Sequence, residues 1–345
     1  MKQSKTVVQP KQIRIGLHPK ASVANEFVNS FTSSLEKNGF QTIESPVRGD
    51  QLKSLDFMIY HWPWFLERGV SIRRGLLGLR HIVKARLANG MKLIWVAHNV
   101  QPHGGGNRLL AWLFCRQLDG VIYLSEHSRQ VVRTTHKFSR NVQELVTVHG
   151  AYNSNRAPQN RTEISAGPVN LFSFGQIRPY KGFDQLLRAS SDLRAPATIT
   201  ITGRVEDGAF ADLIKTTARD RDRITLNLRD DYLPKAELDS MIDACHGVVL
   251  PYRDILNSGA ALHALSRARP VLVPNRGSMP ELRAHIGNQW VHLYDDEFNG
   301  DDLNRFMSAI RDLHPEARPD LSAYSWHRVA RDLTGYLDEL ATDFG

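Results

Sequence analysis

The sequence predicts an α/β protein of two domains, each built on a parallel sheet. Short apolar runs alternate with helical patterns along the chain, a polar aperiodic stretch interrupts them at 152–168, and 345 residues suffice for two ordinary cores. The expected domains are residues 1–163 and 164–325. A terminal helix within 326–345 is expected either to cross back to the first domain or to cover only the second.

A histidine follows each of five expected strands in the first domain within three residues. The strands are residues 12–17, 55–60, 91–97, 120–124 and 144–148, and the histidines are His18, His61, His98, His127 and His149. Ligands of open α/β sheets bind beyond the carboxyl ends of the strands. An ordinary hydrogen-bonded loop role stays open for any single histidine, but the set indicates a ligand site.

Strands of the second domain end differently, in glycine or proline. The expected strands are residues 170–174, 197–202, 223–228, 247–250 and 271–273, followed in turn by Gly175, Gly203 and Pro251-Tyr252 at three of them. Glycine at a strand end allows a phosphate to approach the main chain closely. The second domain is therefore expected to bind a nucleotide.

Residues 171–187 predict a strand, a glycine turn carrying two cations, and a helix start. Gly175 allows the sharp turn, and Arg178 and Lys181 follow it three positions apart. Free N–H groups and the helix dipole favour an anion at such a helix start. The alternative is an ordinary turn with two solvated cations.

A second segment, residues 247–274, repeats the order of strand, loop, helix and strand. Its helix is expected to begin at Asn257-Ser258-Gly259, where Asn or Ser caps the helix and Gly259 keeps its first turn free of bulk. Alone, this triplet is equally an ordinary cap. Together with Arg178 and Lys181, it indicates a diphosphate site.

Charge is distributed unevenly between the two halves. Residues 1–163 hold 23 Lys and Arg against 10 Asp and Glu, whereas the remainder holds 21 against 26. A basic half suggests an acidic partner, which is nucleic acid, an anionic membrane surface or a lipid diphosphate. Nucleic acid is not expected, because no aromatic-rich RNA-binding motif or basic-region dimer pattern is visible, but nucleic-acid binding remains the main non-enzyme alternative.

Two segments of the basic half have the composition of a membrane-binding surface. Residues 68–88 form a basic amphipathic stretch, and residues 109–114 add Trp112 in an apolar helix. Such a pair can rest on an anionic bilayer; the alternative is one solvated cationic helix and one core helix. No apolar run long enough to span a membrane and no signal-peptide core is present, so a cytoplasmic location is expected. Cys115 and Cys245 are expected to be core thiols.

Four segments together resemble a known enzyme family. Residues 174–182 and 250–271 look like the donor-binding half of nucleotide-sugar glycosyltransferases with two facing Rossmann-like domains, the GT-B type. With Asp56-Phe-Met-Ile-Tyr-His-Trp-Pro63 and Trp95-Val-Ala-His-Asn-Val-Gln-Pro-His103, the chain most resembles the bacterial β-mannosyltransferases that extend lipid-linked exopolysaccharide units of the xanthan type. The resemblance spans about 12 to 340.

The resemblance implies a fold, a reaction and a location. It implies two Rossmann-like domains with an interdomain cleft, the first binding the acceptor and the second the donor. The implied reaction moves a hexose, mannose from GDP-mannose, onto a polyprenyl-diphosphate-linked oligosaccharide with inversion. The implied location is the cytoplasmic face of the inner membrane, with the protein bound peripherally to its anionic surface.

The resemblance also assigns residues. On the donor side the site comprises Gly175, Arg178, Tyr180, Lys181, Asn257, Ser258 and Gly259. His98 faces the transferred sugar and His103 follows in the same loop, so these are the leading candidates for the base. His18, His61 and Trp62 are acceptor-side candidates. No cofactor or metal is expected, and the acidic clusters 220–222 and 295–297 are expected at the surface.

The chain departs from related families at four positions. Related retaining enzymes carry two acidic residues where this chain has Ile255 and His263, which favours the mannosyltransferase resemblance. In that narrower family, glutamates occupy the positions of Trp64 and Gly104, so neither position supplies a base here. A retaining transferase that uses a UDP-sugar remains the alternative enzyme, and a sugar-binding protein without catalysis would have no need for two diphosphate cradles.

Overall fold

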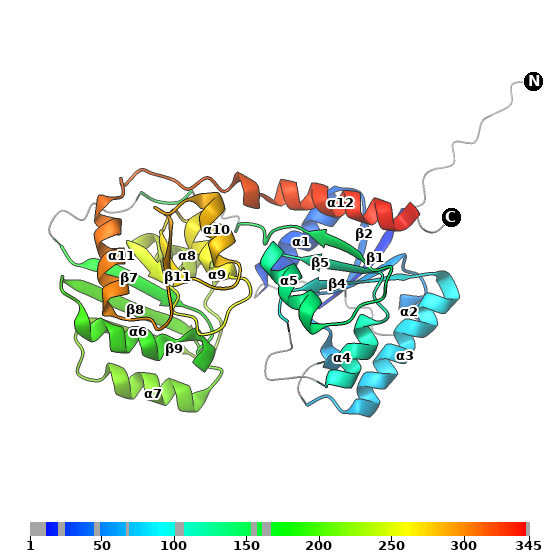
Figure 1. Ribbon diagram of the computed structural model, residues 1–345, viewed down its shortest axis with the longest axis horizontal. Helices are drawn as coiled ribbons and strands as arrows, with labels where there is room; N and C mark the ends of the chain where they lie inside the picture. Colours follow the sequence, from blue (N-terminus) through cyan, green and yellow to red (C-terminus); the bar gives the residue numbers. More distant parts are fainter. Residues whose placement is uncertain are drawn as a thin grey trace, which may run out of the picture. The chain divides into compact units, whose positions relative to one another are not determined.

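The computed structural model describes residues 12–19, 25–44, 49–66, 69–100, 107–152, 157–160 and 167–342 (Figure 1). Contacts divide the chain into two compact units. The first unit is Met1–Leu124, Arg129–Thr147 and Trp326–Gly345, and the second unit is Ser125–Ser128 and Val148–Ser325.

The first unit is built on a six-stranded parallel sheet of order β2-β1-β3-β4-β5-β6. All five predicted strands are present, and β2 is an additional edge strand. The strands are β1 (Arg14–His18), β2 (Gln41–Glu44), β3 (Phe57–Tyr60), β4 (Lys92–Ala97), β5 (Gly120–Tyr123) and β6 (Gln143–Val146).

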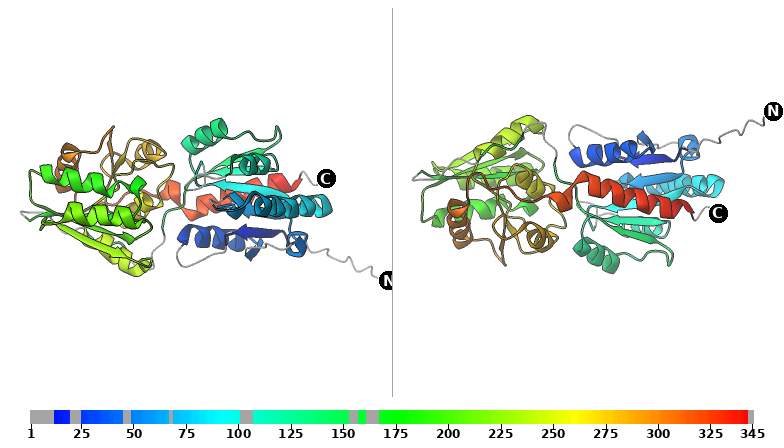
Figure 2. Two further views of the ribbon diagram at one scale, coloured as in Figure 1. Left: turned by 90° about the horizontal axis from the view of Figure 1, so that it is seen from below. Right: turned by 90° about the horizontal axis from the view of Figure 1, so that it is seen from above.

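Helices cover both faces of this sheet, as Figures 1 and 2 show. On one face α1 packs against α12, and on the other α3 contacts α2 and α4. Alternate strand residues supply each core: Met58 and Trp95, for example, join the cluster under α3 and α4. The helices are α1 (Glu26–Lys37), α2 (Gly49–Leu52), η1 (Trp64–Leu66), α3 (Ile72–Asn89), α4 (Arg108–Cys115), α5 (Glu126–Thr135) and α12 (Trp326–Thr342).

The second unit repeats this plan with strand order β12-β11-β10-β7-β8-β9, again all parallel. The five predicted strands are present and β12 is additional. The strands are β7 (Val169–Phe174), β8 (Ala197–Arg204), β9 (Ile224–Arg229), β10 (Gly247–Val249), β11 (Val271–Pro274) and β12 (Val291–Tyr294). The predicted α/β fold, with a Rossmann-like parallel sheet in each half, is confirmed.

Six α-helices and three short 3-10 turns accompany the second sheet in the described chain. A cluster of buried residues joins β7 and β8 to α6, α7 and α11. The elements are η2 (Pro179–Lys181), α6 (Phe183–Ala189), η3 (Ser190–Asp192), α7 (Gly208–Ala218), α8 (Lys235–Ala244), α9 (Gly259–Ser266), α10 (Met279–Ile286), α11 (Gly300–Asp312) and η4 (Ser322–Tyr324).

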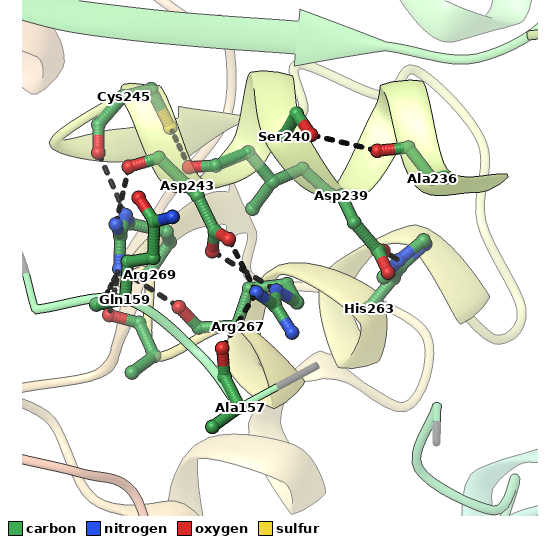
Figure 3. A network of polar contacts seen from close by, with 12 residues as sticks. Ala157, Gln159, Ala236, Asp239, Ser240, Asp243, Cys245, His263, Arg267 and Arg269 are labelled. Carbon is green, nitrogen blue, oxygen red and sulfur yellow. Dashed lines mark hydrogen bonds and ion pairs between the residues drawn. The ribbon is translucent and has the colours of Figure 1, made fainter. Parts of the chain in front are cut away.

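Two fully buried arginines bind part of the polar stretch between the predicted domains to the second unit (Figure 3). Arg267 forms an ion pair with Asp243 and donates to the carbonyl oxygen of Ala157 at 3.2 Å, and Arg269 donates to that of Gln159 at 3.1 Å. A buried guanidinium is costly unless its donors are satisfied, and main-chain oxygens satisfy these. Residues 148–152 and 157–160 accordingly lie with the second unit, whereas the sequence places the boundary at 163.

The last helix, α12, belongs to the first unit. It packs against α1 and β6, and the Tyr336 hydroxyl donates to the Gln143 carbonyl at 3.0 Å. Its apolar stripe is buried: Val329, Leu333, Tyr336, Leu337 and Leu340.

Both cysteines are free and buried, which confirms them as core thiols, and burial raises the pKa of each to about 12.

Among the helices that the structure describes, none has the length and apolar character needed to cross a membrane.

Candidate active site

The glycine turn after β7 requires a glycine. Gly175 has a φ of +137°, and a Cβ at the facing Gly203 would collide with the Gly175 carbonyl oxygen. A φ in this range strains any other residue. The main chain therefore turns sharply where the sequence predicted a phosphate to approach.

Lys181 lies at the end of η2, with its ammonium folded back over this turn. Its Nζ is 4.2 Å from the ring centroid of Tyr252 and 5.3 Å from that of Tyr180, and it would lie 3.5 Å from a Cβ at Gly175. Burial lowers the pKa of Lys181, and Tyr180 opposes that shift in part. No carboxylate among the described residues forms an ion pair with it. A cation that lies over aromatic rings, with no carboxylate partner among the described residues, is suited to an incoming anion.

Arg178 differs from Lys181 because it already has an acidic partner. Its Nη2 lies 3.3 Å from the carboxylate of Glu206, which also pairs with Arg204. Arg178 precedes η2 in extended conformation, with its side chain about a third exposed. To bind a diphosphate, Arg178 must therefore share its contact with Glu206 or give it up, whereas Lys181 pairs with no carboxylate in the described part of the chain.

The two predicted diphosphate segments lie against each other within the second unit. A Cβ at Gly182 would collide with the carbonyl oxygen of Pro251, so η2 approaches the β10–α9 loop closely. Arg253 joins them: its main-chain N–H donates to Tyr180 at 2.8 Å, and its guanidinium binds both carboxylate oxygens of Asp184 at 2.7 and 2.6 Å. Sequence reasoning did not identify Arg253, because its partners are about 70 residues away.

The Asn257-Ser258-Gly259 triplet begins α9 as predicted. The Ser258 hydroxyl caps the helix by accepting from the Ala261 N–H at 3.1 Å, and the Asn257 side-chain oxygen accepts from Ser125 and Ser128. Nδ2 of Asn257 is buried and has no hydrogen-bond partner in the described part of the chain, so this side-chain amide and the main-chain N–H groups are the donors that the segment can offer an anion.

Two aromatic side chains beside Gly259 were not among the residues predicted for the donor site. A Cβ at Gly259 would lie 2.6 Å from the Tyr152 hydroxyl oxygen and 3.2 Å from Nε2 of His149. Burial lowers the pKa of His149 to about 4, so the ring is neutral at pH 7. The sequence pattern could have identified His149, because it follows a predicted strand. Tyr152 lies in the predicted linker, where no pattern pointed to a site residue.

His263 takes the place of the second acidic residue of retaining enzymes. It is buried, and its Nε2 lies 2.5 Å from Asp239 (Figure 3). Its ring stacks on Tyr152 with centroids 4.5 Å apart. These contacts give His263 a structural role inside the unit.

In the first unit, His18, His61, Trp62 and His98 lie at the carboxyl ends of adjacent strands. Nδ1 of His61 is 3.0 Å from Nε2 of His98, and Trp62 stacks on His98 with centroids 4.3 Å apart. Burial, followed by the charge of His18, lowers the pKa of His61 to about 3, and burial also lowers that of His18.

Two further predicted histidines do not join this group. His127 belongs to the second unit, where its main-chain N–H donates to Glu281, and His149 lies beside Gly259 in the same unit. His103 lies outside the described residues. The structure therefore brings together His18, His61, Trp62 and His98 in one unit, and Gly175, Tyr180 and Lys181 in the other, where the β10–α9 loop lies against η2.

No group of three or more His, Cys, Asp or Glu that could hold a metal is present in the part of the chain that the structure describes. The absence of a metal requirement stays a prediction.

Two Rossmann-like units, one carrying a glycine turn and a partly buried cation beside a capped helix start, define a nucleotide-sugar glycosyltransferase of the GT-B type. Solved structures show the same fold. HepE of Anabaena, solved with UDP and glucose, has a TM-score of 0.66 at 12% identity over 95% of this chain and 99% of its own. Sucrose-phosphate synthase of Thermosynechococcus elongatus has 0.69 at 11% identity, over 96% and 100%.

The family follows from a curated relative. The GDP-mannose:glycolipid 4-beta-D-mannosyltransferase of Xanthomonas campestris pv. campestris is 30% identical over 304 residues, which cover 85% of this chain and 82% of the relative. No protein-family model matches the sequence. The chain belongs to the family of this glycolipid mannosyltransferase and is a hexosyltransferase, so the non-enzyme alternatives are set aside.

Proposed function

We propose that the protein transfers mannose from GDP-mannose to a lipid-linked oligosaccharide of exopolysaccharide synthesis, with inversion at the anomeric carbon. The curated relative's name supports the donor and the glycolipid acceptor. His263 supports inversion, because it is buried on Asp239 where retaining enzymes carry an acidic residue.

The observation that carries the donor site is the Lys181 ammonium over Tyr252. In transfer, the bond between the anomeric carbon and the diphosphate breaks, and its electron pair leaves with the diphosphate. A cation already placed at that oxygen stabilises the developing charge without reorganisation. Lys181 supplies this charge, Arg178 adds a second cation, and the main chain at Gly259 supplies N–H donors.

Inversion also requires a base for the acceptor hydroxyl, and the scheme assigns this to His98. An imidazole has a suitable pKa for proton removal near neutrality. His103 is the alternative base. The scheme uses no metal.

A nucleotide screen tests the donor assignment. We expect GDP to raise the thermal unfolding temperature of the protein more than UDP or ADP at equal concentration, because ligands stabilise the folded state according to their affinity. The effect is expected to disappear in Lys181→Met and to persist in Lys215→Met, which removes an exposed lysine of α7. A larger shift with UDP would contradict GDP-mannose as the donor.

We further propose that α3 and α4 rest on the anionic cytoplasmic face of the inner membrane. Neither helix contains an acidic residue, and a Cβ at Gly75 would collide with Leu110, so the two helices pack closely. Between them they expose Ile72, Leu76, Leu77, Leu109 and Trp112 at 43–53% of their surface, beside the exposed cations Arg73, Arg74, Arg80, Lys84, Arg108 and Arg116.

Exposed apolar side chains beside cations are suited to the interface of an anionic bilayer, where the apolar groups contact acyl chains and the cations contact headgroups. A helix that contacts only water gains no stability from exposing such apolar side chains. A hollow of about 190 Å³ beside α3, lined in part by Tyr60, Trp64 and Leu77, adds apolar surface.

Vesicle sedimentation tests this surface. We expect the protein to sediment with vesicles of phosphatidylcholine and phosphatidylglycerol more than with phosphatidylcholine alone, and Leu77→Ser with Trp112→Ser to weaken binding about tenfold. Leu213→Ser on α7, also about half exposed, is the matched control in the second unit. Binding that ignores both the anionic lipid and the double substitution would contradict membrane docking through α3 and α4.

A further inference from the structure

We propose that His61 is a positioning residue, which accepts the Nε2–H of His98 at its own Nδ1 and so leaves Nδ1 of His98 free of a proton. The inference rests on the proposed function, in which His98 takes the proton of the acceptor hydroxyl, and it names the residue that sets the tautomer of that base.

The strand register brings the two imidazoles together. β3 and β4 are adjacent and parallel, with Tyr60 opposite Trp95, and His61 and His98 follow their carboxyl ends. The 3.0 Å separation between Nδ1 of His61 and Nε2 of His98 is that of a hydrogen bond, which needs a single proton between the two nitrogens. One ring must therefore donate and the other accept.

His61 is the ring that stays neutral. It is 1% exposed, and its pKa is lowered to about 3 by burial and then by His18 on β1. A neutral imidazole carries its proton either at Nδ1, where it would donate to His98, or at Nε2, where Nδ1 becomes the acceptor. The surroundings of Nε2 decide between these two forms.

Nε2 of His61 is buried and has no hydrogen-bond partner in the described part of the chain. The rings of Phe31 and Phe27 stand nearly perpendicular to His61, at 87° and 80°, with centroids 4.8 and 5.8 Å away. An aromatic face accepts an N–H weakly, whereas such rings offer no N–H or O–H to an unprotonated nitrogen. The environment therefore favours the proton at Nε2, and Nδ1 accepts from His98.

Stacking holds the accepting geometry. The Trp62 ring lies within 19° of the His98 plane, and Phe27 meets His98 edge-on with centroids 4.8 Å apart. A flip of His98 would move Nε2 away from His61, so the pair fixes which nitrogen of His98 is the base.

In the transfer step, His98 receives the proton that the acceptor hydroxyl loses. The O–H bond of the acceptor breaks, its proton goes to Nδ1 of His98, and its electron pair forms the bond to the anomeric carbon. The bond from that carbon to the diphosphate breaks, and its pair leaves with the nucleotide. The imidazolium that results keeps its Nε2–H on His61, which stabilises the positive charge.

Nitrogen NMR of protein labelled with ¹⁵N-histidine tests the tautomer without measuring activity. The His98 signals are assigned by their loss in His98→Gln. In the wild type we expect the proton on Nε2 and an unprotonated Nδ1. His61→Asn should preserve this form, because its amide oxygen can take the place of Nδ1, whereas His61→Leu should give a mixture of both tautomers.

Kinetics of the same variants provide the second readout. We expect kcat to fall roughly tenfold to hundredfold in His61→Leu with KM for GDP-mannose little changed, and to return to within about threefold of wild type in His61→Asn. Equal loss in both variants would mark a merely structural role and overturn the inference.

The NMR outcome separates this inference from the proposed function. A wild-type His98 protonated at Nδ1 overturns the role of His61, whatever the activity. The expected tautomer with full turnover in His98→Gln would leave that role in place and remove His98 as the base. If His61→Leu does not fold, the wild-type and His61→Asn spectra decide.

Discussion

Replacing Lys181 by methionine is expected to lower kcat about a hundredfold, because it removes the partly buried cation that we propose faces the departing diphosphate. Methionine preserves most of the side-chain volume over Tyr252, so packing changes little. Steady-state kinetics with GDP-mannose measure the loss. Arg178→Met is expected to lose less, since Arg178 already shares Glu206 with Arg204.

Stability measurements provide the control for Lys181. Burial lowers its pKa, which means that the fold disfavours the charged form relative to the unfolded chain. Removing the charge should therefore leave the free energy of unfolding equal or higher. A variant that loses activity through unfolding, or one that keeps wild-type turnover, would contradict the donor role of Lys181.

Replacing His98 by glutamine is expected to lower kcat at least about a hundredfold, because an amide keeps a hydrogen bond to His61 but cannot take a proton. The stabilisation by GDP should persist, since the donor segments lie in the other unit. His327→Gln, which changes an exposed histidine of α12, is the matched control.

His103→Gln belongs in the same experiment, because His103 is the alternative base. Loss of turnover in His103→Gln with normal turnover in His98→Gln would move the base to His103 and contradict the scheme.

The sequence predicted the central strands of both sheets because most of them are apolar runs of buried side chains, as in β3 and β4. Of the four edge strands, it predicted β6 and β9 but missed β2 and β12, which have partly exposed side chains such as Thr42 and His292 and no long apolar run. An edge strand pairs with a single neighbouring strand and buries at most one face, so its composition can resemble that of a loop.

The candidate site was predictable where local sequence determines local geometry. Gly175, Lys181 and the Ser258 cap act through the main chain around them, and their roles can be derived from a short segment. Other residues of the site have partners from distant segments: Glu206 forms an ion pair with Arg178, and Tyr152 lies beside Gly259. The bond between His61 and His98 depends on strand register and ring orientation, which no local pattern contains.

The most direct test of GDP-mannose as donor and of inversion is the product of a single transfer. The protein is incubated in excess chelator with GDP-mannose and a polyprenyl-diphosphate-linked oligosaccharide, and the new linkage is examined by NMR. The account predicts one mannose in β configuration, formed without added metal. An α-linked product, transfer only from a UDP-sugar, or turnover that requires magnesium or manganese would contradict it.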